Sequence, residues 1–181
     1  YSFQNKRLES NKGFAGLENS AGFWKTIVAE DINADGYPDL LVGNLGTNSK
    51  LTASLEHPLK LYHGPLAHPQ SYEQVLSIYK EGQYVTFLGK EELERRMPAL
   101  IRKKYKDYTS FAGQSVEQVF GDPLKKMRAL EIQELSSCLF LNNAGKLFNK
   151  SILPPEIQWS TVFSFCPVDL NRDGKMDIVC G

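Results

Sequence analysis

The sequence DINADGYPD at residues 31–39 has the spacing of a loop that binds a divalent cation. Its first, third, fifth and ninth residues carry side-chain oxygens: Asp31, Asn33, Asp35 and Asp39. A hard cation such as calcium takes about six to eight oxygen ligands, so alternate side chains of a tightly wound loop must converge on it. Gly36, at position six, permits the sharp turn. The backbone carbonyl of Tyr37, at position seven, is the expected additional ligand.

The same pattern returns near the other end of the chain as DLNRDGKMD, residues 169–177. The expected ligands of this second loop are Asp169, Asn171, Asp173, the carbonyl of Lys175, and Asp177. A single D-x-N-x-D-G motif is as often an Asx turn without metal. Two copies, each with carboxylates that repel one another in the absence of a cation, favour metal binding. We therefore expect two Ca²⁺ sites with a structural role.

An EF-hand is the alternative for these loops, because their first six positions match one. An EF-hand needs a bidentate Glu at position twelve, where the two loops have Val42 and Cys180. It also needs helices on both sides, whereas the flanking segments at residues 24–30, 39–44 and 160–168 are rich in β-formers. The sequence therefore predicts strand–loop–strand cation sites.

Further strands are expected between the two loops. The segments LKLYHG, residues 59–64, and VLSIY, residues 75–79, have the composition of strands. Residues 136–148, SSCLFLNNAGKLF, contain a turn-rich Asn-Asn-Ala-Gly and predict a hairpin. Cys138, Cys166 and Cys180 show no metal-binding spacing, and we interpret them as buried free thiols.

Residues 89–135 have a different character. They are rich in Lys, Glu and Leu and predict two or three short helices, broken at Pro98 and around residues 121–123. Their basic cluster, residues 102–106, follows an acidic one, which favours a solvated helix face over an anion-binding patch. The apolar residues of this region could dock a partner, but packing within the fold is favoured: Phe111, Val116, Val119 and Phe120.

The composition excludes several classes of protein. The 181 residues include 21 Lys and Arg and 21 Asp and Glu, so no net charge would draw the chain to nucleic acid. No apolar run approaches the roughly 20 residues of a membrane-spanning helix, so no transmembrane segment is expected. Both ends look cut, which predicts that the chain is a piece of a larger protein.

On these residues, the chain resembles FG-GAP/VCBS repeats, as in integrin α-chain propellers and in bacterial relatives of the cartilage acidic protein and ASPIC/UnbV group. The resemblance rests on both loops and on residues 16–49, 56–64 and 136–148. It implies a mainly β fold, a partial β-propeller of such blades with calcium-binding inter-strand loops and a helical insertion. The implied domains are repeats one and two at 1–88, the insertion at 89–135, and repeat three at 136–181.

One loop departs from the family pattern. Aligning LYHG as the lead-in strand places the second loop at Pro65 to Glu73, where acids would be expected at positions one, three and five. The chain has Pro65, Ala67 and Pro69 there, and only Glu73 is acidic. We expect this loop to hold no cation. The nearby histidines do not predict a converging metal site either: His57, His63 and His68.

The resemblance implies a non-catalytic, calcium-stabilised binding or adhesion module for protein or carbohydrate. The expected location is extracellular or at the cell surface, with the bacterial periplasm or outer membrane as the alternative. The rival interpretation is part of a propeller enzyme, a hydrolase, lyase or quinone oxidoreductase, whose active site lies mostly outside this fragment. Against it, the sequence has no G-x-S-x-G or H-E-x-x-H motif and no Cys or Ser with a plausible His partner.

Overall fold

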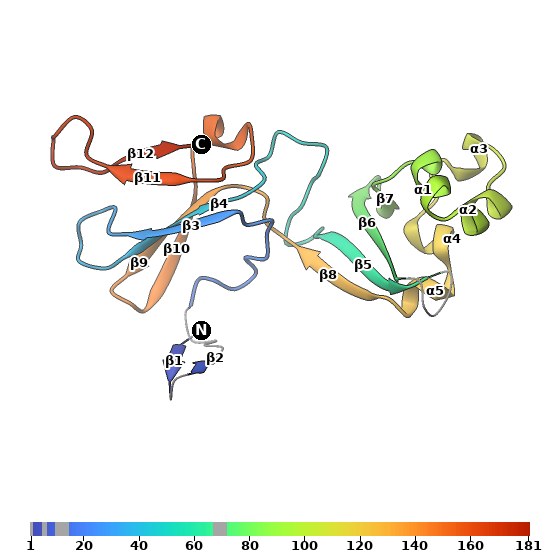
Figure 1. Ribbon diagram of the computed structural model, residues 1–181, viewed down its shortest axis with the longest axis horizontal. Coiled ribbons are helices and arrows are strands. Elements are labelled where there is room, and N and C mark those ends of the chain that lie inside the picture. The colour runs from blue at the N-terminus through green and yellow to red at the C-terminus, as the bar shows by residue number, and fades with distance from the viewer. Residues whose placement is uncertain (1, 5–6, 10–14, 67–71) are drawn as a thin grey trace. The chain divides into compact units, whose positions relative to one another are not determined.

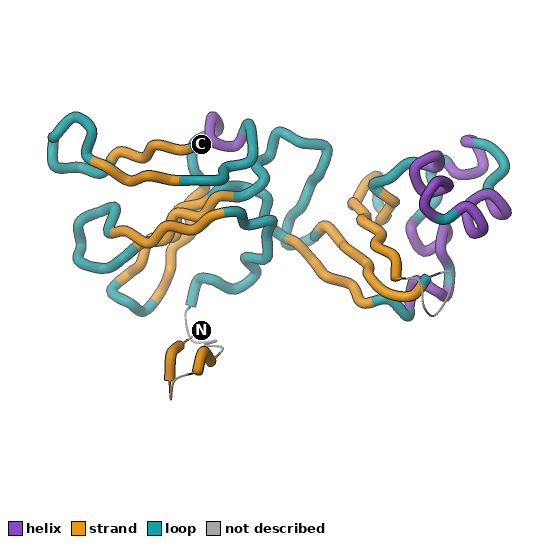
Figure 2. Tube along the Cα trace, in the orientation of Figure 1, coloured by secondary structure: helices purple, strands orange, loops and turns teal. Residues whose placement is uncertain are grey.

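The computed structural model describes residues 2–4, 7–9, 15–66 and 72–181 (Figure 1). The chain is mainly β, with several antiparallel sheets, and it divides into two compact units. The first unit is Tyr1–Ser49 with Leu135–Gly181, and the second is Lys50–Glu134. The α-helices among the described residues all belong to the second unit, and the helical segment that Figure 2 draws in the first unit is a 3-10 helix. The described residues form no closed propeller.

A four-stranded antiparallel sheet forms the centre of the first unit. Its strands, in spatial order, are β10 (Leu147–Ile152), β9 (Cys138–Asn143), β4 (Asp39–Gly43) and β3 (Thr26–Glu30). The predicted hairpin is confirmed, because β9 and β10 pair around Ala144 and Gly145, which have φ angles of 53° and 73°. Two consecutive left-handed residues suit a tight hairpin turn.

Apolar side chains cover both faces of this sheet. On one face Val28, Leu41 and Leu139 pack against the hairpin of β11 (Phe165–Val168) and β12 (Asp177–Cys180). The 3-10 helix η1 (Pro155–Gln158) precedes this hairpin. The opposite face carries Val42, Cys138, Phe140 and Phe148, with Leu17 and Trp24 packed on them. Both faces are apolar, as expected for a sheet that packs against other layers on both sides.

The second unit has its own sheet and its own core. Its strands, in spatial order, are β7 (Gln83–Thr86), β6 (Tyr72–Lys80), β5 (Leu59–Pro65) and β8 (Arg128–Ile132). Five short helices follow β7: α1 (Lys90–Arg96), α2 (Pro98–Lys104), α3 (Tyr108–Phe111), α4 (Val116–Phe120) and α5 (Asp122–Lys125). The predicted break at Pro98 is confirmed, since this residue begins α2.

The apolar residues of the helical region are buried in this second core. Val116, Val119 and Phe120 are at most 4% exposed, and Phe111 packs on them. They share the cluster with Tyr62 of β5 and Val75 of β6. Packing, rather than an exposed docking surface, is therefore their role in this structure.

The predicted domains were repeats one and two at 1–88, a helical insertion at 89–135 and repeat three at 136–181. The two compact units divide the chain at different residues. Strands β5 and β6 belong to the same unit as the helices, and β8 lies within the predicted helical stretch. Strand β8 pairs with β5, with Leu130 opposite Leu61. This pairing makes the segment a strand although its local composition favours a helix. Strand β9 pairs with β4, so the second unit is inserted between two neighbouring strands of one sheet. The repeat boundaries themselves stay a prediction.

A minor sheet is formed by the described parts of the N-terminal segment. Strands β1 (Ser2–Gln4) and β2 (Arg7–Glu9) pair antiparallel.

Candidate functional site

The loop between β3 and β4 is wound by hydrogen bonds from its own side chains. The carboxylate of Asp31 accepts from the amides of Asp35 at 3.0 Å and Gly36 at 2.8 Å. Asn33 Oδ1 accepts from that same Asp35 amide at 3.1 Å. An oxygen of Asp31 and one of Asn33 therefore meet at a single N–H group. Asp35 Oδ1 in turn accepts from the amide of Tyr37 at 2.9 Å.

The loop between β11 and β12 repeats this geometry. Asp169 accepts from the amides of Asp173 at 3.1 Å and Gly174 at 2.9 Å, and Asn171 Oδ1 shares the Asp173 amide at 3.0 Å. Asp173 Oδ1 accepts from the amide of Lys175 at 2.9 Å. The two loops thus have the same bonds at positions one, three, five and seven.

The backbone of both loops turns through left-handed residues at the same positions. Position four has φ of 59° at Ala34 and 61° at Arg172. Position six has φ of 90° at Gly36 and 84° at Gly174, which is the conformation that the sequence assigned to these glycines. The repeat in the sequence is therefore a repeat of backbone conformation.

Position nine has a second role in the first loop. Asp39 is fully buried, and its Oδ2 accepts from the amide of Ile32 at 3.0 Å. Its Oδ1 accepts from the amide of Asn142 at 2.7 Å, and Asn142 Nδ2 donates to the carbonyl of Pro38 at 2.9 Å. Asp39 thus ties the loop to β9. Sequence reasoning missed Asn142, which lies 103 residues after Asp39 in the chain. In the sequence, Asn142 indicated only a hairpin turn.

The equivalent residue in the second loop is less enclosed. Asp177 is half-buried, and its Oδ2 accepts from the amide of Leu170 at 3.1 Å, as Asp39 does from Ile32. Both loops therefore contain the same hydrogen bond, from the amide at position two to the carboxylate at position nine.

The oxygen atoms of each loop suit a hard cation, although they do not come from a cluster of three acidic side chains. Within the described residues, no group of three or more His, Cys, Asp or Glu side chains is arranged to hold a metal ion. Positions one, three and five instead offer two carboxylates and one amide oxygen, and position seven offers a backbone carbonyl. An all-oxygen set of this kind is the one that calcium takes. In the first loop each carboxylate oxygen of Asp39 also accepts a hydrogen bond from a backbone amide, which leaves further lone pairs on this carboxylate.

The two loops line one cleft of about 420 Å³. Figure 1 shows both loops at the same end of the first unit. One wall is formed by the first loop and the other by the second: Asp31, Ile32, Asn33 and Ala34 face Gly174, Lys175 and Met176. The cleft is therefore lined by polar residues, Asp31 and Asn33 from the first loop and Lys175 from the second, together with apolar ones.

The other predicted candidates lie elsewhere. Pro65 ends β5 and Glu73 lies in β6, but Ala67, His68 and Pro69 are outside the described residues, so the expected empty loop is not described. His57 stacks on Tyr79, with ring centroids 3.6 Å apart. His63 lies in β5 opposite Gln74 and Arg128.

Two of the three cysteines correct the prediction of buried thiols. Cys138 is buried in β9, but Cys166 and Cys180 are exposed on the β11–β12 hairpin. The hairpin is covered on its Phe165 face, and the side chain of Cys166 lies on the opposite face with Val179. The sequence of a strand shows which side chains share a face of the sheet, but it does not show which face is covered by other residues.

The basic cluster of the second unit is held by local partners. Arg102 Nε donates to Glu94 at 2.7 Å, and Lys90 Nζ donates to the other oxygen of Glu94 at 2.8 Å. The hydrogen bond from Lys90, followed by that from Arg102, lowers the pKa of Glu94 from its usual 4.5. Lys104 Nζ donates to the carbonyls of Gln118 and Val119 at the end of α4. These contacts favour a structural role for the cluster.

The family model of the FG-GAP repeat matches residues 23–50. The chain therefore contains a segment that matches an FG-GAP repeat. The matched stretch contains β3, the first loop and β4. Comparisons with curated proteins and with solved structures found no match.

Proposed function

We propose that this protein is built of FG-GAP repeats and is a non-catalytic, calcium-stabilised β-propeller fragment that acts as a binding or adhesion module for protein or carbohydrate. The observation that carries the proposal is the identical winding of two cation-type loops around one cleft. The proposed location is outside the cell or at the cell surface, where calcium is abundant enough to occupy weak sites at about 10⁻⁴ to 10⁻³ M.

The proposed calcium ligands are those named from the sequence. In the first loop they are Asp31, Asn33, Asp35, the Tyr37 carbonyl and Asp39, and in the second Asp169, Asn171, Asp173, the Lys175 carbonyl and Asp177. A bound cation would neutralise the carboxylates of each loop. The intraloop hydrogen bonds support this assignment, because they already hold the oxygens of positions one and three at one amide.

The packing of the first unit supports the propeller interpretation. One four-stranded meander is followed by a loop-bearing hairpin that packs on its face, and both carry the same nine-residue motif. Radial packing of four-stranded sheets is the architecture of a propeller. The finer assignment, to the bacterial relatives of the cartilage acidic protein and ASPIC/UnbV group, belongs to the same proposal.

The cleft between the loops is the proposed ligand-contact region. Propeller loops at one end of the blades are suited to binding, because a rigid scaffold positions them. No described helix is long and apolar enough to cross a membrane. The equal numbers of acidic and basic residues, 21 of each, give no support to a nucleic-acid partner.

The calcium part of the proposal is tested by calorimetric titration of the metal-free chain. The parent should bind two Ca²⁺ ions, while Asp35→Ala and Asp173→Ala should each bind one, and calcium should raise the thermal midpoint by mass action. Asp122→Ala is the matched control, because Asp122 is an exposed carboxylate of the second unit that pairs with Lys125. No binding by the parent at millimolar calcium contradicts the proposal.

The binding part is tested separately on arrays of glycans and extracellular proteins. We expect ligand capture in calcium, its loss in a chelator, and its loss in Lys175→Glu, which reverses the charge on one wall of the cleft. A ligand that binds equally well without calcium and to the variant would place the binding surface elsewhere. Turnover of an array compound would support the enzyme alternative.

A further inference from the structure

The pairing of β4 with β9 stops just before the first loop. The last pair of the ladder is Leu40 opposite Phe140, so the next position of β9 beyond it that faces the loop is Asn142, opposite Pro38. Side-chain bonds replace the ladder here. Asn142 N donates to Asp39 Oδ1 at 2.7 Å, and Asn142 Nδ2 donates to the Pro38 carbonyl at 2.9 Å. The end of β9 is therefore joined directly to the loop.

Asn142 holds the backbone between two of the proposed calcium ligands. These ligands are the carbonyl of Tyr37 at position seven and the carboxylate of Asp39 at position nine, with Pro38 between them. The bond from Asn142 Nδ2 fixes the peptide group that joins Pro38 to Asp39. The proline ring fixes the φ angle between this peptide group and the Tyr37 carbonyl. One side chain of another strand thus restrains both ligands.

The carboxylate of Asp39 is a buried charge without a cationic partner among the described side chains. Asp39 is 0% exposed, and none of the ion pairs formed by the described residues includes it. Its two oxygens accept from the amides of Ile32 and Asn142, which are neutral donors. A buried charge is costly unless an opposite charge pairs with it. A cation in the loop would compensate this charge, so the placement of Asp39 bears on how tightly the cation binds.

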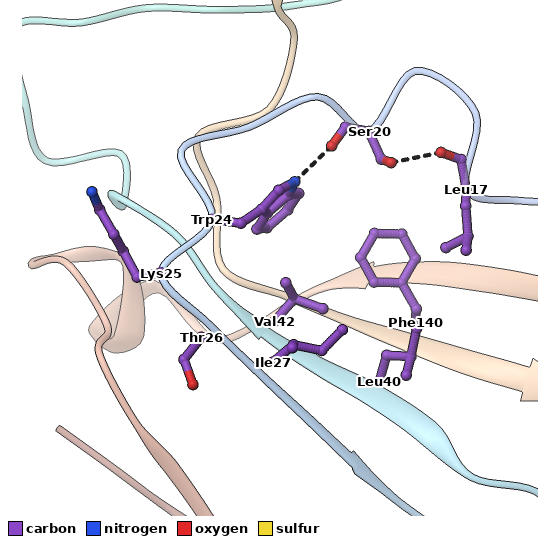
Figure 3. Close-up of a pocket in the computed structure, with 9 residues that line it drawn as sticks. All are labelled: Leu17, Ser20, Trp24, Lys25, Thr26, Ile27, Leu40, Val42 and Phe140. Atoms are coloured by element: carbon purple, nitrogen blue, oxygen red, sulfur yellow. Dashed lines mark hydrogen bonds between the residues drawn. The ribbon is translucent and has the colours of Figure 1, made fainter. Parts of the chain in front are cut away.

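Asn142 is itself held in place by the β9–β10 hairpin. Its Oδ1 accepts from the Gly145 amide at 2.8 Å within the turn, and its partner across the hairpin is Phe148. Phe148 is 8% exposed and packs in the apolar cluster that contains Val42 and Phe140. The side chains of Val42 and Phe140 lie on the same face of the sheet in Figure 3. Asn142 is therefore anchored independently of the loop that it contacts.

We propose that Asn142 is a positioning residue for the first calcium loop, acting through Pro38 and Asp39 without contacting the cation. This inference rests on the proposed calcium function. Groups that orient metal ligands from outside typically contribute about 10- to 100-fold to metal affinity. The side-chain bonds of Asn142 go to the first loop and to its own turn. The effect is therefore specific to the first loop.

Three substitutions separate this role from the stability of the turn. Asn142→Ala removes both side-chain bonds. Asn142→Ser keeps an oxygen that can accept from the Gly145 amide, as Ser does in such turns, but its shorter side chain does not reach Pro38. Asn143→Ala is the matched control, because Asn143 is an exposed residue of the same turn whose backbone carbonyl accepts from the Lys146 amide.

The experiment is calorimetric calcium titration with one loop inactivated at a time. In the Asp173→Ala background, which leaves the first loop, Asn142→Ala and Asn142→Ser should each weaken calcium binding at least about tenfold, whereas Asn143→Ala should not. In the Asp35→Ala background, which leaves the second loop, none of the three should change the affinity. Both loops lie in the first unit, so a general loss of stability would weaken both.

The outcomes separate this inference from the proposed function. A parent that binds no calcium contradicts the proposed function and this inference with it. Two sites in the parent with an unchanged first-loop affinity in Asn142→Ala would overturn the positioning role alone. Equal weakening of both loops, or parent-like affinity in Asn142→Ser, would also overturn it, because the effect would then come from overall stability or from the turn.

A measurement on chains with an intact Asn142 covers the case of variants that do not fold. Calcium should slow hydrogen exchange of the Asn142 amide by several-fold in the parent, because this amide donates to a carboxylate that the cation holds. The same addition should leave the exchange unchanged in Asp35→Ala. An unchanged rate in a calcium-bound parent, or an equal slowing in Asp35→Ala, would overturn the proposal.

Discussion

The carboxylate of Asp39 accepts hydrogen bonds from two backbone amides on different elements, Ile32 in the loop and Asn142 at the end of β9. The sequence motif identifies Asp39 as position nine of a cation loop but contains nothing about β9. The loop conformation could be predicted because its bonds are local. The tie to Asn142 could not, because it depends on a strand pairing across an inserted unit.

Asp39→Asn should destabilise the first unit by about 2 kcal/mol, because an amide nitrogen would face a backbone N–H group in a buried position. The internal repeat supplies the control. Asp177→Asn should cost less, because Asp177 is only half-buried. Urea unfolding in the absence of calcium measures both, and equal losses would contradict a special role for Asp39.

Gly46 shows how a glycine can be required by its neighbours. Its φ is +87°, and a Cβ there would lie 2.5 Å from the carbonyl oxygen of Gln158. Gln158 is itself fixed, since its side chain bonds to Ser137 and Leu153. The strain of the left-handed backbone and the steric clash therefore add.

Gly46→Ala should lower the free energy of unfolding by about 3 kcal/mol. Gly82→Ala measures the cost of the left-handed backbone alone, because Gly82 has φ of +86° and nothing lies within 4 Å of the added Cβ. It should cost only about 1 kcal/mol. Chemical denaturation compares the two, and a similar cost at both positions would rule out the clash.

At the scale of elements, short runs rich in β-forming residues predict the strands best. The runs expected at 24–30, 39–44 and 75–79 become β3, β4 and β6, with their ends shifted by a few residues. Strand β8 was missed because RALEI has the composition of the helices before it, and only pairing with β5 makes it a strand. The pairing of β4 with β9 is equally invisible in the sequence, because the sheet closes across residues 50–134.

The contact between α1 and α2 carries an acid-sensitive ion pair. The pKa of Glu94 is lowered in the folded state, so its contribution to stability is present above 4.5 and is lost as pH falls through the lowered pKa. The thermal midpoint of the second unit should therefore fall in this window, and Glu94→Gln should reduce that fall. Glu81→Gln is the control, because Glu81 is 82% exposed and pairs only loosely with Lys80 at 3.8 Å. Identical pH profiles of the parent and Glu94→Gln would contradict the assignment.

On the scale of the whole molecule, one compact unit is inserted into another. The chain leaves and re-enters the first unit at neighbouring points, since Gly46 N donates to the Leu135 carbonyl at 2.8 Å. The first and last strands of the second unit, β5 and β8, pair with each other, with Leu59 opposite Ile132. Each unit also has its own apolar core. These features indicate that each unit can fold without the other.

Replacing residues 50–134 by a short glycine-rich linker should leave the first unit folded, because closing a shorter loop between adjacent strands costs little entropy. The excised segment should also fold alone. Circular dichroism and cooperative thermal unfolding of both pieces test this. Loss of cooperative unfolding in either piece would show that the units depend on one another.

The central claim is that both nine-residue loops bind calcium. The most direct measurement is an anomalous difference map from crystals of the chain grown in calcium. We predict one peak in each loop, at about 2.3–2.6 Å from oxygens at positions one, three, five and seven. Well-ordered loops with no peak, or a peak in one loop alone, would contradict the account of two equivalent sites.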